Sequence, residues 1–445
     1  MSITQSLGEK IVLQEAQLVV PSVRQERFMA HHQPEELFSV NARGLKPSAI
    51  EAIHKLLEQP GMRSLAGAWP DPLVFQTDEI AAIIAELLDK QGDQALQYGS
   101  TRGQPVLRQA LADMASSQLG FECSAQQILV TSGSAQGLDL ACRLFIDPGD
   151  VVLVGLPSYF GATATIASHG GINVGIPLDE QGIRTDLMAE KILGLQQEGK
   201  RLKAAYVIPN FQNPSGVTMS ARRRTELIDL AERFQFMIFE DDPYGELRFE
   251  GEHLAPLAAL DTSGRVIHFH STSKTFSPGM RVAWVAAQAP VIDRMERLKQ
   301  ASDISTNSLS QLVLLELIRS GRLQEGIERN RAHYRRKRDL MLGLMDQHFP
   351  KEVHWTRPSG GFFTFVTLPQ EINSDDLLSD ALEQSIAYVS GPSFFVDGSG
   401  QNSFRLSFSQ ASVEDIEAAI PSLAGLIKKR LSTQSHQDSE DRQRC

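Results

Sequence analysis

The feature that most constrains the fold is the alternation of helix-like stretches with short apolar runs between residues 77 and 182. In chain order these segments read IAAIIAELLDK, VLRQALADMASSQLG, ILVTSGS, AQGLDLACRLF and VVLVGLP. Three further runs continue the series: AAYVIP (204–209), MIFEDD (237–242) and VIHFHSTS (266–273). Such alternation predicts an α/β fold with a mostly parallel sheet covered on both faces. Each run ends in polar residues, and ligands of these folds bind at the carboxyl ends of strands.

The length of 445 residues predicts a large domain with a smaller companion. After about residue 320 the pattern changes to a long basic helix followed by strand-like segments, which is typical of an α+β domain. We expect an N-terminal arm at 1–45, an N-terminal part of the small domain at 46–76, the large domain at 77–320, the C-terminal small domain at 321–431 and a frayed polar tail at 432–445.

Composition excludes several classes of partner. Lys and Arg number 43 against 54 Asp and Glu, and the net charge of −11 argues against nucleic acid. The N-terminus lacks the basic start and apolar stretch of a secretory signal, and no 18-residue apolar window could span a membrane, so we expect a cytoplasmic protein. The three cysteines form no CxxC pair, so neither disulfides nor a metal site are expected.

The segment from His270 to Arg281 holds the most informative lysine. Lys274 directly follows an apolar strand and is flanked by Ser271 and Ser273, with a Pro-Gly turn before Arg281. Partial burial would lower the pKa of this lysine and favour the neutral amine that forms an imine. An anion beside it could bind the two serines and the arginine. The alternative is a surface lysine after a strand.

Polar residues also follow the neighbouring strands. Ser134 and Ala135 open a helix after ILVTSG, so their amides could cradle a phosphate. Asn213 follows AAYVIP, and Asp241 with Tyr244 follows MIFE. Each segment could instead be an ordinary turn, because Asn, Asp, Pro and Gly are common turn residues.

The order and spacing of these motifs resemble those of fold-type I pyridoxal 5′-phosphate (PLP) enzymes. The motifs are Tyr98, Gly133-Ser134-Ala135-Gln136-Gly137, Pro157-Ser158-Tyr159, Asn213-Pro214-x-Gly216, Asp241-x-x-Tyr244, Ser271-x-Ser273-Lys274, Arg281 and Arg405. More narrowly, residues 46–427 are similar to the class I/II aminotransferase branch that contains 2-aminoadipate and kynurenine aminotransferases and the C-terminal domain of MocR regulators. The resemblance implies a large domain with a mostly parallel seven-stranded sheet between helices, plus a smaller α+β domain.

The resemblance also implies roles at the cofactor ring. Lys274 would carry PLP as an internal Schiff base and later move the proton from the substrate Cα. Asp241 would pair with the pyridinium nitrogen, so that the ring can absorb electrons. Asn213 and Tyr244 would hydrogen-bond the phenolic oxygen, and Tyr159 would stack on the ring.

The remaining implied roles concern the phosphate and the substrate. The phosphate would be bound by Ser134, Ala135, Ser271 and Arg281, with Tyr98 arriving from a neighbouring subunit, which implies a homodimer with a shared active site. Gln136 and Ser273 would also belong to the cofactor-binding residues. Arg405 would clamp the substrate α-carboxylate as a bidentate pair. Without the resemblance, Arg405 could be a surface charge on a strand.

The chain departs from the family pattern near the substrate. Relatives commonly read Gly-Gly-Leu-Pro where this chain has Gly67-Ala68-Trp69-Pro70. Trp69 could reshape the substrate pocket or fill the domain interface. Where dicarboxylate-specific relatives can carry an arginine, this chain has Glu51. If Glu51 lines the pocket, it would repel a distal carboxylate of the substrate and favour a substrate with an apolar or basic side chain. Alternatively, it is a glutamate in the first turn of a helix, where the helix dipole favours a negative charge.

The expected function is transfer of an amino group from an L-α-amino acid donor to a 2-oxo acid acceptor, within amino acid metabolism or biosynthesis. A racemase, decarboxylase or oxidase could use the same cofactor site, and a clamped carboxylate at Arg405 argues against decarboxylation. A non-catalytic MocR-like ligand sensor is the third reading. The forty or so residues that precede the fold are too few for its DNA-binding module and carry no basic recognition helix.

Overall fold

The computed structural model describes residues 37–43 and 61–444 of the chain, which divides into two units, residues 1–45 and 46–445. The described part of the first unit is one helical turn, α2 (Val40–Arg43). Ser39 Oγ accepts a hydrogen bond from the amide of Ala42 there, at 3.2 Å. The rest of the expected N-terminal arm lies outside the described residues. None of the described helices combines the length and the apolar character needed to cross a membrane.

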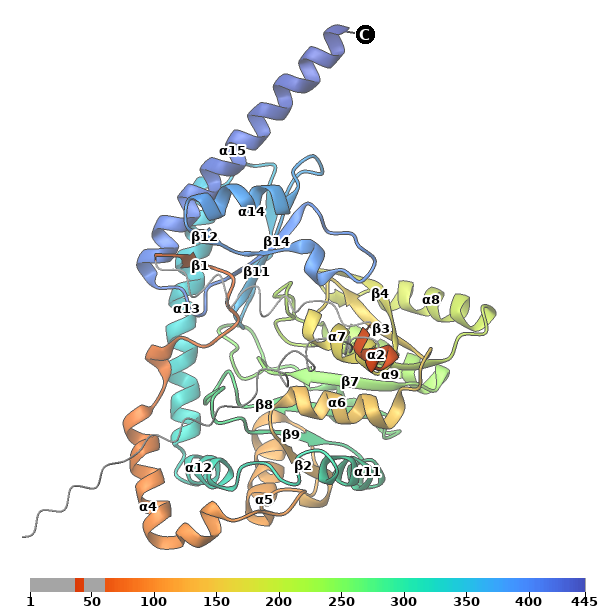
Figure 1. Ribbon diagram of the computed structural model, residues 1–445, viewed down its shortest axis with the longest axis vertical. Coiled ribbons are helices and arrows are strands. Elements are labelled where there is room, and N and C mark those ends of the chain that lie inside the picture. Colours follow the sequence, from red (N-terminus) through yellow and green to blue (C-terminus); the bar gives the residue numbers. More distant parts are fainter. Residues whose placement is uncertain (1–36, 44–60, 445) are drawn as a thin grey trace, which may run out of the picture. The chain divides into compact units, whose positions relative to one another are not determined.

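The second unit is built around a mostly parallel sheet in the order β2-β9-β8-β7-β6-β3-β4-β5 (Figure 1). The strands are β2 (Ile128–Thr131), β3 (Val151–Leu156), β4 (Ile172–Asp179), β5 (Gly182–Ile183), β6 (Leu202–Val207), β7 (Met237–Asp242), β8 (Val266–Ser271) and β9 (Ala283–Ala286). β9 runs antiparallel to both of its neighbours, β2 and β8, and β5 runs antiparallel to β4. The count exceeds the expected seven by one, because the two-residue β5 folds back on the end of β4.

Alternating residues of the strands face two different sets of helices. Val152 and Val154 of β3 belong to the same buried cluster as Leu138 of α6, whereas Leu153 clusters with Leu227 of α9. This period of two confirms that helices cover both faces. The helices of this region are α4 (Thr77–Leu96), α5 (Pro105–Met114), α6 (Ser134–Phe145), α7 (Phe160–Ser168), α8 (Thr185–Gln197), α9 (Ala221–Phe234), α10 (Leu257–Leu260), α11 (Ala289–Gln300) and α12 (Ser308–Arg319).

A second, antiparallel sheet has the order β10-β11-β14-β13, with β10 (His354–Trp355), β11 (Phe363–Thr367), β13 (Val389–Ser390) and β14 (Ser403–Ser407). Beside it, β1 (Arg63–Ser64) pairs in parallel with β12 (Ile386–Ala387), so the chain before α4 joins the C-terminal part. The associated helices are α13 (Arg322–His348), α14 (Ser374–Glu383) and α15 (Val413–Arg444). Figure 1 shows α13 reaching from α12 to this second sheet, where it packs on α15.

The expected fraying of the tail at 432–445 stays a prediction. The backbone of this segment is helical, since α15 continues through Arg444. The physical reason is that this polar segment contains neither glycine nor proline, the two residues that most disfavour a helix.

Candidate active site

The carboxyl ends of neighbouring strands meet at one edge of the large sheet. Ser271 of β8 pairs with Ala283 of β9, which pairs in turn with Thr131 of β2. In the next strand, Asp241 of β7 pairs with Phe269 of β8. The segments that follow β2, β7 and β8 therefore start side by side, at the edge where the sequence predicted a ligand site.

Lys274 lies at this edge, with its side chain partly buried. Its Nζ donates a hydrogen bond to the carbonyl oxygen of Ala68 at 2.9 Å. Burial, and then the charges of Arg281 and Arg405, lower the pKa of Lys274 to about 8. The neutral amine, which is the nucleophilic form, is thus accessible near neutral pH.

Asp241 is 8% exposed, and its two carboxylate oxygens have different surroundings. Oδ2 accepts a hydrogen bond from the hydroxyl of Tyr206 at 2.7 Å, whereas Oδ1 is buried and has no partner in the described chain. Burial raises the pKa of Asp241 to about 6, and the bond from Tyr206 opposes that rise. A buried, unpaired carboxylate oxygen fits a protonated ring nitrogen of a cofactor.

An anion cradle forms where β2 turns into α6. The helix starts at Ser134 after Gly133, whose φ of 99° favours glycine. Within the described residues the amides of Ser134 and Ala135 have no hydrogen-bond acceptor. Arg281 Nη2 donates to the carbonyl oxygen of Ser132 at 3.0 Å, so a guanidinium lies against this turn. Free amides at the start of a 12-residue helix beside an arginine fit a phosphate group.

Gln136 supports this turn with its side chain. Its Oε1 accepts from the amide of Ser132 at 2.8 Å, and its Nε2 donates to Asp303 Oδ2 at 2.7 Å. Lys299 Nζ donates to the other oxygen of Asp303 at 2.6 Å. The side chain of Gln136 thus already has two protein partners, and it links the turn to the half-buried Lys299–Asp303 ion pair.

The other residues expected at the phosphate lie in two places. Ser271 and Ser273 are buried next to Lys274, and the amide of Ser273 donates to Ser271 Oγ at 3.3 Å. Tyr98 follows α4 and is 77% exposed. No hydrogen bond or ring contact within the described chain joins Tyr98 to the other expected site residues.

Arg405 and Asn213, distant in sequence, meet at the site. Arg405 is 1% exposed; it donates from Nη1 to Asn213 Oδ1 at 2.9 Å and from Nη2 to the carbonyl oxygen of Ala66 at 2.5 Å. Its guanidinium carbon lies 4.3 Å from the ring centroid of Phe363 and 5.2 Å from that of Phe394. Burial lowers the pKa of Arg405 to about 10. A buried, oriented guanidinium with Nε unpaired among the described residues suits a carboxylate.

Two tyrosines share this neighbourhood. The ring of Tyr244 makes edge contacts with Phe362 and Phe363, both at 5.6 Å between centroids. Burial raises the pKa of Tyr244 and of Tyr159, and the charge of Asp241 raises both further. Both phenols therefore keep their protons, and both lie close enough to Asp241 to feel its charge.

The segment at 65–71 borders the site next to Lys274 and Arg405. The carbonyl oxygen of Ala68 accepts a hydrogen bond from Lys274 Nζ at 2.9 Å, and that of Trp69 accepts one from Ser409 Oγ at 2.7 Å. The half-buried Trp69 packs on an apolar cluster formed by Ala66, Phe365, Ala387, Val389 and Phe394. Glu51 lies outside the described residues.

Sequence reasoning missed three residues at this site. Tyr206 resembles a core residue, because it lies inside an apolar run, although its position one strand before Asp241 was a usable signal. Phe363 and Phe394 were not singled out, because aromatic residues in a strand and a turn carry no chemical signature. Their contact with Arg405 depends on tertiary packing.

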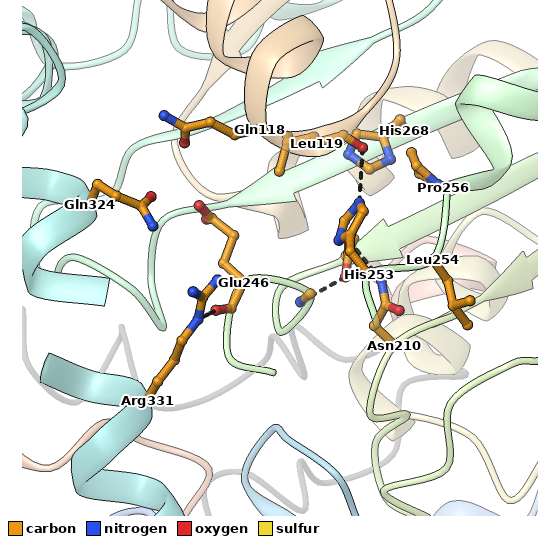
Figure 2. Close-up of a pocket in the computed structure, with 12 residues that line it drawn as sticks. Gln118, Leu119, Asn210, Glu246, His253, Leu254, Pro256, His268, Gln324 and Arg331 are labelled. Carbon is orange, nitrogen blue, oxygen red and sulfur yellow. Dashed lines mark hydrogen bonds between the residues drawn. The ribbon is translucent and has the colours of Figure 1, made fainter. Parts of the chain in front are cut away.

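A separate cavity of about 320 Å³ is lined in part by the loop that follows β7 (Figure 2). Its walls include Asp242, Glu246, His253, His268 and Arg331, and neither Asp241 nor Lys274 lines it. Successive residues of a strand point to opposite faces of the sheet, so Asp242 lines this cavity while Asp241 points to the other face.

Known proteins resemble the chain over most of its length. Residues 71–423 match the protein family described as aminotransferase class I and II. The chain is 41% identical over 397 residues to aromatic-amino-acid aminotransferase 1 of Thermococcus litoralis, covering 89% of this chain and 95% of the relative. It is 34% identical over 400 residues to 2-aminoadipate transaminase of Thermus thermophilus, covering 89% and 98%. A solved structure of Pyrococcus horikoshii kynurenine aminotransferase, in complex with PMP and KYN as substrates, is similar with a TM-score of 0.86 at 38% identity, over 90% of this chain and 98% of that one.

Proposed function

Because the chain belongs to the class I and II aminotransferase family, we propose that Lys274, Asp241 and Arg405 carry its reaction. The resemblance predicted from the motifs is confirmed: the protein is a PLP-dependent aminotransferase that moves the amino group of an amino acid to a 2-oxo acid. When bound, the cofactor stores the amino group and takes up the electrons left at the substrate α-carbon. The observation that carries the proposal is that one site contains both Lys274, whose pKa is lowered, and the buried Asp241 Oδ1, which has no partner in the described chain.

The residues that hold the cofactor act on its two charged ends. The amides of Ser134 and Ala135, with the guanidinium of Arg281, would bind the phosphate, while Asp241 Oδ1 would accept a hydrogen bond from the ring nitrogen. The other proposed contacts are Tyr159 on the ring face, Asn213 and Tyr244 at the phenolic oxygen, and Ser271, Ser273 and the partner subunit's Tyr98 around the phosphate. Gln136 would serve the cofactor site indirectly, by supporting the turn that holds the phosphate.

The proton steps fall to Lys274. When it is not bound to the cofactor, its neutral Nζ would accept the proton from the substrate α-carbon and would later give that proton up again. The carbonyl oxygen of Ala68, 2.9 Å from Nζ, orients the amine beforehand. Asp241, as a carboxylate, would hold the ring nitrogen of the cofactor in its protonated form, which would make that proton transfer easier.

Arg405 would clamp the substrate α-carboxylate, because it is buried and already oriented by Asn213 and Ala66. We propose a donor with an aromatic or large apolar side chain. Half-buried Trp69 and the ring of Phe394, 5.2 Å from the Arg405 guanidinium, provide an apolar surface beside the clamp. The names of the relatives, which include aromatic-amino-acid and kynurenine aminotransferases, favour the same class of donor.

The reaction is tested by mixing the yellow holoenzyme with single amino acids and following the cofactor absorbance, with the 2-oxo acid product identified by mass spectrometry. Aromatic and large apolar amino acids should bleach the absorbance, and a 2-oxo acid should restore it. Lys274→Ala should bind PLP without turnover, whereas Lys191→Ala, at an exposed lysine of α8, should behave as wild type. Normal turnover by Lys274→Ala would refute the assignment.

We further propose a homodimer in which Tyr98 completes the partner's phosphate site. Its 77% exposure, next to Leu96 at 75%, supports an interface there. Mixing inactive Lys274→Ala protomers with Tyr98→Ala protomers should recover activity, because one site of each hybrid dimer is intact. No recovery from a mixture in which hybrids form would contradict a shared site.

We also propose domain boundaries at 46–76, 77–320 and 321–431, and a cytoplasmic location. The second sheet, whose strands all lie between residues 354 and 407, supports a separate C-terminal small domain.

A further inference from the structure

Tyr206 is the one residue of the described chain that hydrogen-bonds the side chain of Asp241. The two residues lie on adjacent parallel strands, β6 and β7, where Tyr206 pairs with Phe239. Because Asp241 is two positions beyond Phe239, its side chain points to the same face of the sheet as that of Phe239. The Tyr206 hydroxyl then reaches Asp241 Oδ2 at 2.7 Å.

The hydroxyl of Tyr206 can act only as a donor to this carboxylate. Tyr206 is 1% exposed, and burial, together with the charge of Asp241, raises its pKa well above the ordinary value. A phenol that keeps its proton beside an ionised carboxylate makes a charge-assisted hydrogen bond. The bond takes up one of the two carboxylate oxygens and leaves Oδ1 as the free acceptor.

The groups that act on Asp241 come from several elements. Burial raises its pKa most, and the bond from Tyr206 opposes this most strongly; Asp242 of β7 raises it, while His268 of β8 and Lys274 lower it. Tyr206 alone of these donates directly to the carboxylate. Without Tyr206, Asp241 would still be buried, but it would lose the hydrogen bond that most strongly opposes the rise in its pKa.

We infer that Tyr206 is a positioning residue of the cofactor site, which fixes Asp241 through Oδ2 so that Oδ1 stays ionised and available to the ring nitrogen. This inference rests on the proposed role of Asp241. The competing explanation is that Tyr206 only fills the core, since its ring belongs to the main apolar cluster of the sheet. In that case its hydroxyl would be dispensable.

The test compares the affinities of the apoenzyme for PLP and for 1-deaza-PLP, in which a CH group replaces the ring nitrogen. Wild type should prefer PLP, because only PLP can use Asp241. Tyr206→Phe keeps the ring contacts and should reduce this preference by up to about tenfold, because the lost hydrogen bond to a charged group affects the preference only through its coupling to the ring nitrogen. In steady-state kinetics it should lower kcat more than it changes KM.

Tyr388→Phe is the matched control. Tyr388 is equally buried at 1% exposure, and its hydroxyl donates to the carbonyl oxygen of Ser374 at 2.6 Å, beside the second sheet. The variant removes the same buried hydroxyl and should leave the cofactor preference unchanged. Site-specific 3-fluorotyrosine at position 206 is a stronger hydrogen-bond donor of nearly the same shape, and it should raise the preference for PLP over 1-deaza-PLP. This second variant keeps the test decisive if Tyr206→Phe fails to fold.

Asp241→Asn separates the inference from the function on which it rests. If Asp241→Asn loses the preference and Tyr206→Phe keeps it, the positioning role of Tyr206 is wrong and the role of Asp241 stands. If Asp241→Asn keeps the preference, the assignment of Asp241 to the ring nitrogen fails and the inference fails with it. Loss of the preference in both, with Tyr388→Phe unchanged, supports the inference.

Discussion

Replacing Lys337 should loosen the segment at 65–71. Lys337 lies on α13 with 3% exposure, and its Nζ donates to Asp71 Oδ2 and to the carbonyl oxygen of Ser409, both at 2.7 Å. Asp71 is itself 6% exposed. Although burial alone would raise the pKa of Asp71, Lys337 and its other partners hold it below the ordinary value. The pair therefore fixes the segment to the C-terminal part of the chain.

Lys337→Met leaves a buried carboxylate without its cation. Breaking a buried ion pair by removing one partner costs about 3–5 kcal/mol. We take the lower end, about 3 kcal/mol, because His333 Nε2 and the amide of Leu73 remain within 2.9 and 3.1 Å of the Asp71 carboxylate. The double variant Asp71→Asn with Lys337→Met should recover most of this loss, since no unpaired charge remains.

The assay is hydrogen exchange of peptides that cover residues 65–75, because a multidomain cofactor enzyme does not unfold in a single two-state step. A loss of about 3 kcal/mol predicts that amide protection falls about a hundredfold. Lys191→Met, at an exposed position of α8, should leave the protection unchanged. A fall of less than about threefold in Lys337→Met, or a double variant as labile as the single one, would refute the reasoning.

Three further outcomes test the site. Arg405→Lys should lower kcat/KM for amino donors by about 10- to 150-fold in steady-state kinetics, because an ammonium cannot replace a bidentate guanidinium; an unchanged value would contradict the clamp. Gly133→Ala should weaken PLP binding in equilibrium dialysis by about tenfold or more, because φ is +99° and an added Cβ would push the Arg281 guanidinium away from the phosphate turn. Gly343→Ala, with open space around it, should have no effect. The pKa of Lys274 is lowered to about 8, so its amine is protonated below that pH and neutral above it. The apoenzyme should therefore bind added PLP faster as the pH rises through about 8. A binding rate independent of pH would contradict the lowered pKa of Lys274.

Residues at strand ends could be predicted from the sequence because their signal is local. Lys274 and Asp241 each follow an apolar run directly, and the order of such runs places their ends at one edge of a parallel sheet. The family resemblance then supplied their chemistry. Arg405 was predicted from the resemblance alone, since an arginine on a short strand has no local signature.

The remaining features depend on distant contacts. Tyr206 resembles a core residue until the register of β6 and β7 brings its hydroxyl to Asp241. Lys337 lies in a basic helical segment typical of a solvated face, and its partner Asp71 is 266 residues away. The short β5 and the helical tail escaped prediction because a two-residue hairpin and a polar helix both lack clear periodicity.

The hydrogen-bond acceptors of the segment at 65–71 have a consequence for engineering this enzyme. Arg405, Lys274 and Ser409 donate to the peptide carbonyls of Ala66, Ala68 and Trp69, and side-chain replacement leaves a peptide carbonyl in place. The side chain at position 69 can therefore be varied while the acceptors that orient the lysine and the arginine are retained. Libraries aimed at a new amino donor can concentrate diversity at this position, because this segment contacts Lys274 and Arg405 through its backbone.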